Sequence, residues 1–244
     1  MTYCVAMSLN KGLIFMSDTR TNAGIDNISS FRKMHSWCVE GERVITIMTA
    51  GNLATTQAVI SLLEERSKAV SERQPSILGV PSMFQVARHV GDTLREVIRD
   101  YRGSGPDQSN GAFNASIIVG GQIKGGEPRL FMLYPEGNFI EAGDDTPFFQ
   151  IGETKYGKPI LVRAYDPDMS FEAAVKLLLV SFNSTLKANL SVGMPFDVQV
   201  YERDAFAIRH TGRIHETDDY YQQISESWGA ALTTALESLP DFNF

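Results

Sequence analysis

The order of strand-like and helix-like segments limits the folds open to this chain more than any other feature of its sequence. The first fifty residues contain four short apolar runs joined by turns, and the pair around Asn10–Gly12 is typical of a β-hairpin. Two helical patterns follow, then four strand-like runs, one long helix, two strands and a last helix. These later segments are predicted at residues 52–73, 83–101, 113–123, 128–135, 137–143, 147–152, 171–190, 196–203, 205–212 and 218–239.

Helices that come in blocks between blocks of strands predict an α+β fold rather than an alternating parallel α/β sheet. The strand-like runs are almost continuously apolar, so both faces of each sheet should be covered. We therefore expect a four-layer αββα sandwich, in which two antiparallel sheets pack face to face between helix layers. The four runs before residue 50 are expected to form one antiparallel sheet. No internal repeat or long linker divides residues 1–244, which predicts a single domain.

Charge and apolar content exclude several classes of protein. The net charge is -7 and no block of Lys and Arg occurs, so a nucleic-acid partner is not expected. No apolar run reaches the length of about 18 residues that suggests a membrane helix, and no signal-peptide pattern opens the sequence. Cys4 and Cys38 lie in apolar runs and are expected to be buried, reduced thiols. These features predict a cytoplasmic protein without a membrane partner.

Thr2 is the first candidate for chemistry, because it follows the initiator methionine directly. If Met1 is removed, Thr2 carries a hydroxyl nucleophile and a free α-amine, which form a complete nucleophile and base on one residue. An α-amine with a reference pKa of about 7.7–8.0 is partly unprotonated at neutral pH. One bridging water would let the hydroxyl proton reach the amine. The alternative is that residue 2 is an ordinary surface residue of a loose terminus.

Asp18 and Lys33 are expected to lie near Thr2. The hairpin at Asn10–Gly12 returns the chain to its start and so brings the end of the second strand beside Thr2. A lysine near Thr2 would lower the pKa of the hydroxyl, and an aspartate would keep that lysine charged and oriented. Taken singly, a turn-capping aspartate and a solvated edge-strand lysine are the better interpretations. Together with a threonine at position 2, the three residues favour a catalytic site.

These residues resemble a known family. Thr2, the segment SDTRTNAG at 17–24 and the segment SFRKM at 30–34 are similar to the pattern of proteasome β subunits, which are N-terminal nucleophile (Ntn) hydrolases. The resemblance continues through TAGNLATTQAVISLL and covers about residues 2–212, which leaves a C-terminal helical extension at about 213–244. The single residue before Thr2 and the segment IGETKYGKPIL resemble the bacterial proteasome-like group called Anbu.

The resemblance implies the αββα Ntn fold and self-association into a multi-subunit ring or an open helical assembly. It implies cleavage of peptide or amide bonds by Thr2, with Asp18 and Lys33 as its electrostatic support. Gly51 would provide an oxyanion N–H, because glycine lets the backbone approach a tetrahedral intermediate. Asn22 would contact the substrate backbone, and Thr49 would line a specificity pocket. No metal or cofactor is implied, and whether an unfoldase feeds the particle is left open.

The sequence also departs from the proteasome pattern around this centre. The helper Asp and Ser near the end of the long helix align with Asn189 and Val192, and the serine after the IG turn aligns with Glu153. If Glu153 lies near Lys33, it could act as a counter-charge or draw the lysine away. Two alternatives therefore stay open beside a peptidase: a non-proteolytic assembly or binding scaffold, and an Ntn amidase for a small non-protein amide.

Overall fold

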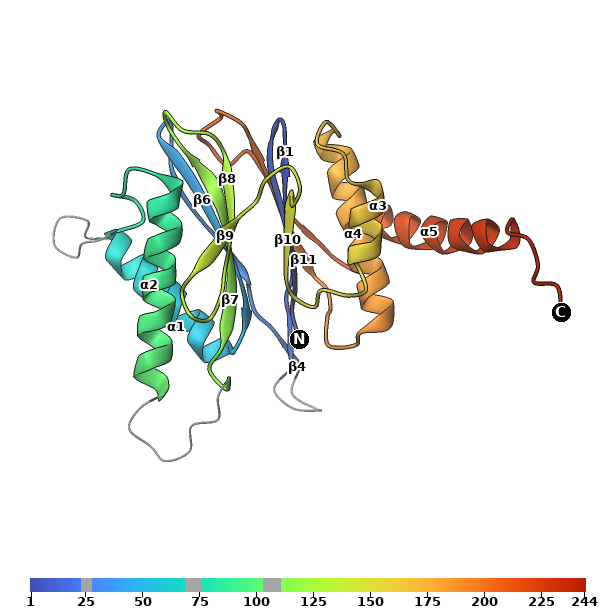
Figure 1. The fold of residues 1–244 in the computed structure, drawn as a ribbon, viewed down its shortest axis with the longest axis horizontal. Coiled ribbons are helices and arrows are strands. Elements are labelled where there is room, and N and C mark those ends of the chain that lie inside the picture. Colours follow the sequence, from blue (N-terminus) through green and yellow to red (C-terminus); the bar gives the residue numbers. More distant parts are fainter. Residues whose placement is uncertain (23–27, 69–75, 103–110) are drawn as a thin grey trace.

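The computed structural model describes the chain except for residues 23–27, 69–75 and 103–110. Two five-stranded antiparallel sheets form its centre, as predicted (Figure 1). The first sheet has the order β10-β1-β2-β11-β12, and the second has the order β5-β6-β7-β8-β9. The strands of the first sheet are β10 (Phe148–Gly152), β1 (Tyr3–Leu9), β2 (Gly12–Asp18), β11 (Phe196–Glu202) and β12 (His210–Ile214). Those of the second are β5 (Met34–Val39), β6 (Arg43–Gly51), β7 (Ala115–Ile123), β8 (Arg129–Leu133) and β9 (Phe139–Glu141).

Helices cover the outer face of each sheet, which confirms the αββα layering. Helices α1 (Leu53–Lys68) and α2 (Met83–Arg102) lie against the second sheet, and α3 (Lys158–Ala164) and α4 (Phe171–Ala188) lie against the first (Figure 1). Helix α4 begins where the sequence predicts, because the Ser170 side chain accepts a hydrogen bond from the backbone N–H of Ala173.

Three hydrophobic clusters explain why the strands are apolar on both faces. In β1, Val5 and Met7 pack toward α4, whereas Cys4 and Ala6 pack into the layer between the sheets. All seven residues of β2 are buried in the same way. Since side chains alternate along a strand, each central strand contributes to two clusters at once. The two sheets therefore depend on each other and on their helices for burial.

The first four apolar runs do not form one sheet, and that part of the prediction is wrong. The hairpin of β1 and β2 belongs to the first sheet, whereas the hairpin of β5 and β6 belongs to the second. Short turns determine the pairing inside each hairpin. They do not determine the pairing between hairpins, because the connection after Asp18 is long enough to cross from one sheet to the other. Two short paired strands, β3 (Arg20–Asn22) and β4 (Ile28–Ser30), lie in this connection.

Two further expectations are wrong. The last strand of the first sheet is β12 rather than residues 205–212, because Asp204 and Phe206 have positive φ angles of 63° and 44° that interrupt an extended chain. Cys4 is a buried free thiol as expected, but Cys38 is exposed. Cys38 lies in β5, an edge strand of the second sheet, whose side chains are only partly covered.

Helix α5 (Asp219–Glu237) corresponds to the last predicted helix and projects away from the sandwich (Figure 1). Tyr221 in its first turns is buried and donates a hydrogen bond to Asn183 of α4. Beyond that contact the helix exposes large apolar side chains, namely Leu232, Leu236 and, just after its end, Leu239. Within the described residues, no helix is long and apolar enough to cross a membrane.

Candidate active site

The β1–β2 hairpin positions the N-terminal end of the chain. Tyr3 begins β1 between β2 and β10, so Thr2 lies at the same end of the sheet as Asp18. The carbonyl of Thr2 accepts a hydrogen bond of 2.6 Å from the backbone N–H of Glu153, just after β10. A Cβ atom on Gly152 would lie 2.1 Å from that carbonyl oxygen, and the φ angle of Gly152 is +83°. Glycine is therefore required here if the chain is to hold Thr2 so closely.

Asp18 and Lys33 form a buried ion pair next to this terminus. The ammonium Nζ of Lys33 lies 2.7 Å from Oδ1 of Asp18 and also donates to the carbonyl of Arg20 at 2.6 Å. The same Oδ1 accepts the backbone N–H of Tyr3 at 2.9 Å, and Oδ2 accepts the N–H of Gly193 at 3.3 Å. The aspartate thus connects the lysine to the residue that follows Thr2.

Opposing effects act on the charges of this pair. Burial raises the pKa of the Asp18 carboxyl above its ordinary value, and the Lys33 charge together with hydrogen bonds from Lys33, Tyr3 and Gly193 offsets part of this rise. The hydrogen-bond donors favour the ionised form of the carboxylate. In the chain that begins at Met1, burial and the Lys33 charge lower the pKa of the α-amine below its ordinary value of 8.0. The positive field of Lys33 therefore reaches the N-terminus.

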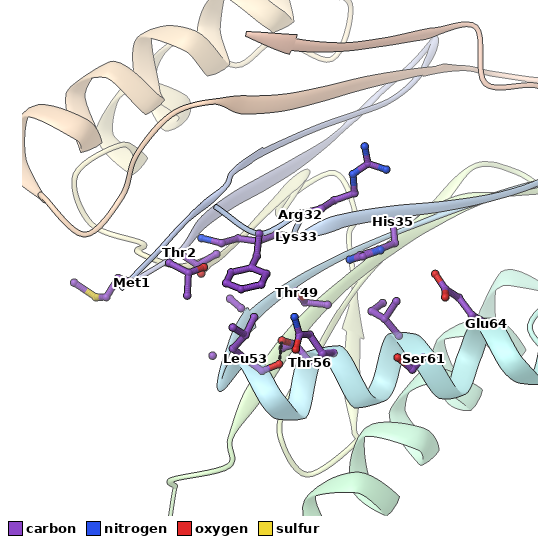
Figure 2. Close-up of a pocket in the computed structure, with 16 residues that line it drawn as sticks. Met1, Thr2, Arg32, Lys33, His35, Thr49, Leu53, Thr56, Ser61 and Glu64 are labelled. Atoms are coloured by element: carbon purple, nitrogen blue, oxygen red, sulfur yellow. Dashed lines mark hydrogen bonds between the residues drawn. The ribbon is translucent and has the colours of Figure 1, made fainter. Parts of the chain in front are cut away.

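A cavity of about 510 Å³ opens beside Thr2, between β5, β6 and α1 (Figure 2). Of the residues predicted from sequence, Thr2, Lys33, Thr49 and Gly51 line it. Asp18 stands behind Lys33, with a fully buried side chain. The structure therefore brings these five residues together at one end of one cavity.

Asn22 is placed less completely. Its backbone pairs with Ile28 in the short β3–β4 ladder, but its side chain lies outside the described part of the structure. The neighbouring Thr21 lines the cavity.

The position of Gly51 has a geometric cause. Gly51 ends β6 with a φ angle of +114°, and a Cβ atom there would lie 2.4 Å from the carbonyl oxygen of Asn114. The next residue, Asn52, accepts the N–H of Thr55 with its side chain and so helps to start α1. A glycine thus permits the sharp change from β6 into α1, directly beside the cavity.

Glu153 does not pair with Lys33. Its Oε1 accepts the backbone N–H groups of Thr154 and Lys155, and its Oε2 accepts the Asn189 amide at 2.9 Å. Burial opposes ionisation of Glu153, but these hydrogen bonds hold its pKa below the ordinary value. Two of the residues that depart from the proteasome pattern, Glu153 and Asn189, therefore bind each other. They join the turn after β10 to the end of α4, and leave Lys33 paired with Asp18.

Sequence reasoning missed the residues at the other end of the cavity. His35, which belongs to none of the motifs described above, lines the cavity together with Ser61 and Glu64. Two spacings could have found them. His35 follows Lys33 by two residues, at the start of β5, and Glu64 follows Ile60 by four on α1, so in each pair the two side chains can lie on one side of the segment. Within the described ranges, no group of three His, Cys, Asp or Glu side chains could hold a metal.

Comparisons with known proteins agree with this architecture. A family model described as "Proteasome subunit" matches residues 2–201. An Anbu (Gly-1) mutant from Hyphomicrobium sp. strain MC1 is 50% identical with a TM-score of 0.91, and Anbu (ancestral beta-subunit) from Yersinia bercovieri is 47% identical with a TM-score of 0.92. Each of these alignments covers 100% of both chains. The Anbu chain in a helical assembly from Pseudomonas aeruginosa is 48% identical with a TM-score of 0.92, over 99% of this chain and 98% of the relative.

Proposed function

The chain belongs to the proteasome subunit family and has the Ntn-type fold of its Anbu members, and from this premise we propose that it is an N-terminal threonine hydrolase of peptide or amide bonds. The observation that supports this most strongly is the buried Lys33–Asp18 pair, which lies in and behind the wall of the cavity that Thr2 lines. A positive charge at that place favours the alkoxide form of a neighbouring hydroxyl.

In the proposed reaction, the active chain begins at Thr2. The Thr2 hydroxyl oxygen bonds to the carbonyl carbon of the substrate, and its proton passes through water to the Thr2 α-amine. The N–H of Gly51 stabilises the oxyanion. The carbon–nitrogen bond of the substrate then breaks, and the leaving amine takes the proton. Water activated by the same α-amine hydrolyses the remaining ester on Thr2 and restores the enzyme.

Self-association is part of the proposal. The solved Pseudomonas aeruginosa relative forms a helical assembly, and this chain aligns with nearly all of it. The apolar side chains at the end of α5 are exposed in a single chain and would be covered in such an assembly. The free thiols of Cys4 and Cys38 fit a reducing compartment, so we expect the particle in the cytoplasm.

Replacing Thr2 tests the reaction directly. Protein whose first residue is Thr2 should hydrolyse fluorogenic peptide amides, and Thr2→Ala should abolish turnover while circular dichroism stays unchanged. Thr233→Ala, at an exposed position of α5, serves as the matched control and should keep full activity. Equal rates of hydrolysis by Thr2→Ala and the parent protein would contradict the proposal that Thr2 is the nucleophile.

Glu153 and Asn189, which bind each other, stand where the proteasome pattern has a serine and an aspartate. This difference also favours a second candidate, a non-proteolytic scaffold on the same fold. In that case the residues around Thr2 would keep their positions without supporting turnover. A chain that begins at Thr2, assembles, and reacts with neither an epoxyketone nor a β-lactone would support the scaffold. Turnover of small amides without cleavage of any peptide would instead indicate the amidase.

A further inference from the structure

The cavity beside Thr2 changes in chemical character along its length. In Figure 2, Thr2 lies at one end and Glu64 at the other, with α1 along one wall. Lys33 immediately precedes β5 and His35 is the second residue of that strand, and both side chains line the cavity. Ile60 and Glu64 are four apart on α1 and share a face. The cavity therefore leads away from the nucleophile in a single direction.

Both aliphatic and polar side chains line the middle of the cavity, and its far end is polar. Leu53 lies at the Thr2 end, and between the two ends Ala50 and Ile60 provide aliphatic contacts beside the polar side chains of Thr49, Thr56 and Gln57. Beyond them come the Ser61 hydroxyl, the His35 imidazole and the Glu64 carboxylate. This sequence of surfaces matches a side chain with a long aliphatic stem and a charged head. A purely apolar side chain of the same length would leave its end against polar groups.

The far end of the cavity is negative at neutral pH. Burial lowers the pKa of His35, so the imidazole is mostly neutral at pH 7 and can exchange hydrogen bonds with a ligand. Glu64 is exposed and acts electrostatically on His35. Arg32 also borders the cavity, but its side chain points away from α1 in Figure 2, and it also lines a second cavity that contains Asp197. The charge of Arg32 also acts on His35, but the effect of Glu64 is larger, so the Glu64 carboxylate is the main charge beside the imidazole.

We propose that this cavity selects substrates with a lysine or arginine side chain on the acyl side of the bond that Thr2 attacks. The aliphatic stem lies against Ala50 and Ile60, and the cationic head binds near Glu64 and His35. This inference rests on the proposed hydrolase function. Because Glu64 is exposed, its contribution is that of a solvated ion pair, up to about 1 kcal/mol, or about fivefold in rate.

Two electrophilic probes test the inference. They are peptide epoxyketones that differ only in the side chain beside the electrophile: lysine in one and norleucine, which has the same stem without the ammonium, in the other. Protein that begins at Thr2 should be labelled about fivefold faster by the lysine probe. Glu64→Gln should remove this preference, and Glu64→Lys should reverse it. Glu40→Gln removes the same charge at an exposed residue of the β5–β6 turn and should leave the ratio unchanged.

The outcomes separate the inference from the proposed function. Equal labelling of Thr2 by both probes, or the same preference in Glu64→Gln and the parent protein, would overturn the selectivity and leave Thr2 as the nucleophile. A faster reaction with the norleucine probe would show an apolar pocket. Labelling by neither probe would remove the hydrolase function and, with it, the selectivity.

Discussion

At the scale of single residues, the position of Lys33 depends on a balance of buried charges. Its ammonium is almost inaccessible to solvent, and the Asp18 carboxylate beside it is fully buried. Removing two charges from water is costly, and the cost is recovered only when the partners and their hydrogen bonds are all in place. Asp18 meets that condition, since it also accepts the N–H groups of Tyr3 and Gly193. The ion pair therefore stabilises the position of the N-terminal strand as well as that of the Lys33 side chain.

Lys33→Met should lower the free energy of unfolding by about 3 kcal/mol, because it leaves the Asp18 charge buried without its partner. The double variant Asp18→Asn with Lys33→Met should be less destabilised than the sum of the two single changes. Arg95→Met breaks an exposed ion pair with Asp92 and should cost less than about 1 kcal/mol. Urea denaturation measures all four variants, and equal costs for Lys33→Met and Arg95→Met would contradict the account.

The pH dependence of labelling follows from the α-amine. Only the unprotonated amine can accept the hydroxyl proton, so the rate should fall as the pH falls through the pKa of that amine. Burial and Lys33 lower the pKa of the amine on Met1 from 8.0, and we expect the same causes to act on the amine of Thr2. The half-maximal rate of reaction with an epoxyketone should thus lie below pH 8. A midpoint above pH 8, or a rate independent of pH, would contradict this role for the amine.

At the scale of elements, the backbone conformation at the end of β6 allows α1 to begin directly after it. Gly41 and Gly51 both have positive φ angles, +74° and +114°, but only a Cβ atom on Gly51 would meet backbone. Gly41→Ala should cost about 1–2 kcal/mol through conformational strain. Gly51→Ala should cost more, because its Cβ atom would collide with the carbonyl of Asn114 as well. Thermal unfolding of both variants measures the difference, and equal destabilisation would show that the close approach is unimportant.

Local sequence patterns were sufficient to predict some of the helices and strands, but not all of them. The β1–β2 hairpin, the start of helix α4 at Phe171 and helix α5 were predicted because turn residues and apolar periodicity act over a few neighbours. The strand at 205–212 was misplaced because the positive φ angles of Asp204 and Phe206 have no glycine to mark them. Gln122 holds this turn by binding Asp204, a contact between distant parts of the sequence that local patterns do not reveal.

At the scale of the whole molecule, two features could be assigned only from the three-dimensional structure. These are the sheet to which each strand belongs and the residues that line the far end of the cavity. Patterns predicted the four layers, because each sheet needs cover on both faces. They did not reveal that the two N-terminal hairpins lie in different sheets, or that His35 and Glu64 share a cavity with Thr2. They also left open whether Glu153 pairs with Lys33, which depends on where α4 ends.

Assembly is the prediction that belongs to the whole molecule. Leu232 and Leu236 lie on one face of α5 and are 50% and 71% exposed in a single chain. Changing both to glutamate should reduce the sedimentation coefficient, because charged side chains disfavour burial in an interface between copies. Thr234→Glu, an exposed position on the opposite face of the same helix, should leave it unchanged. Identical sedimentation of the leucine double variant and the parent protein would exclude this helix from assembly.

The most direct test of the central claim is intact-mass analysis, followed by peptide mapping, of protein that begins at Thr2 and has reacted with a peptide epoxyketone. The account predicts one adduct per chain, located on Thr2, and its loss in Lys33→Met protein that is still folded. An adduct on any other residue, or an unmodified chain whose N-terminal sequence begins with Thr2, would contradict the assignment of Thr2 as the nucleophile.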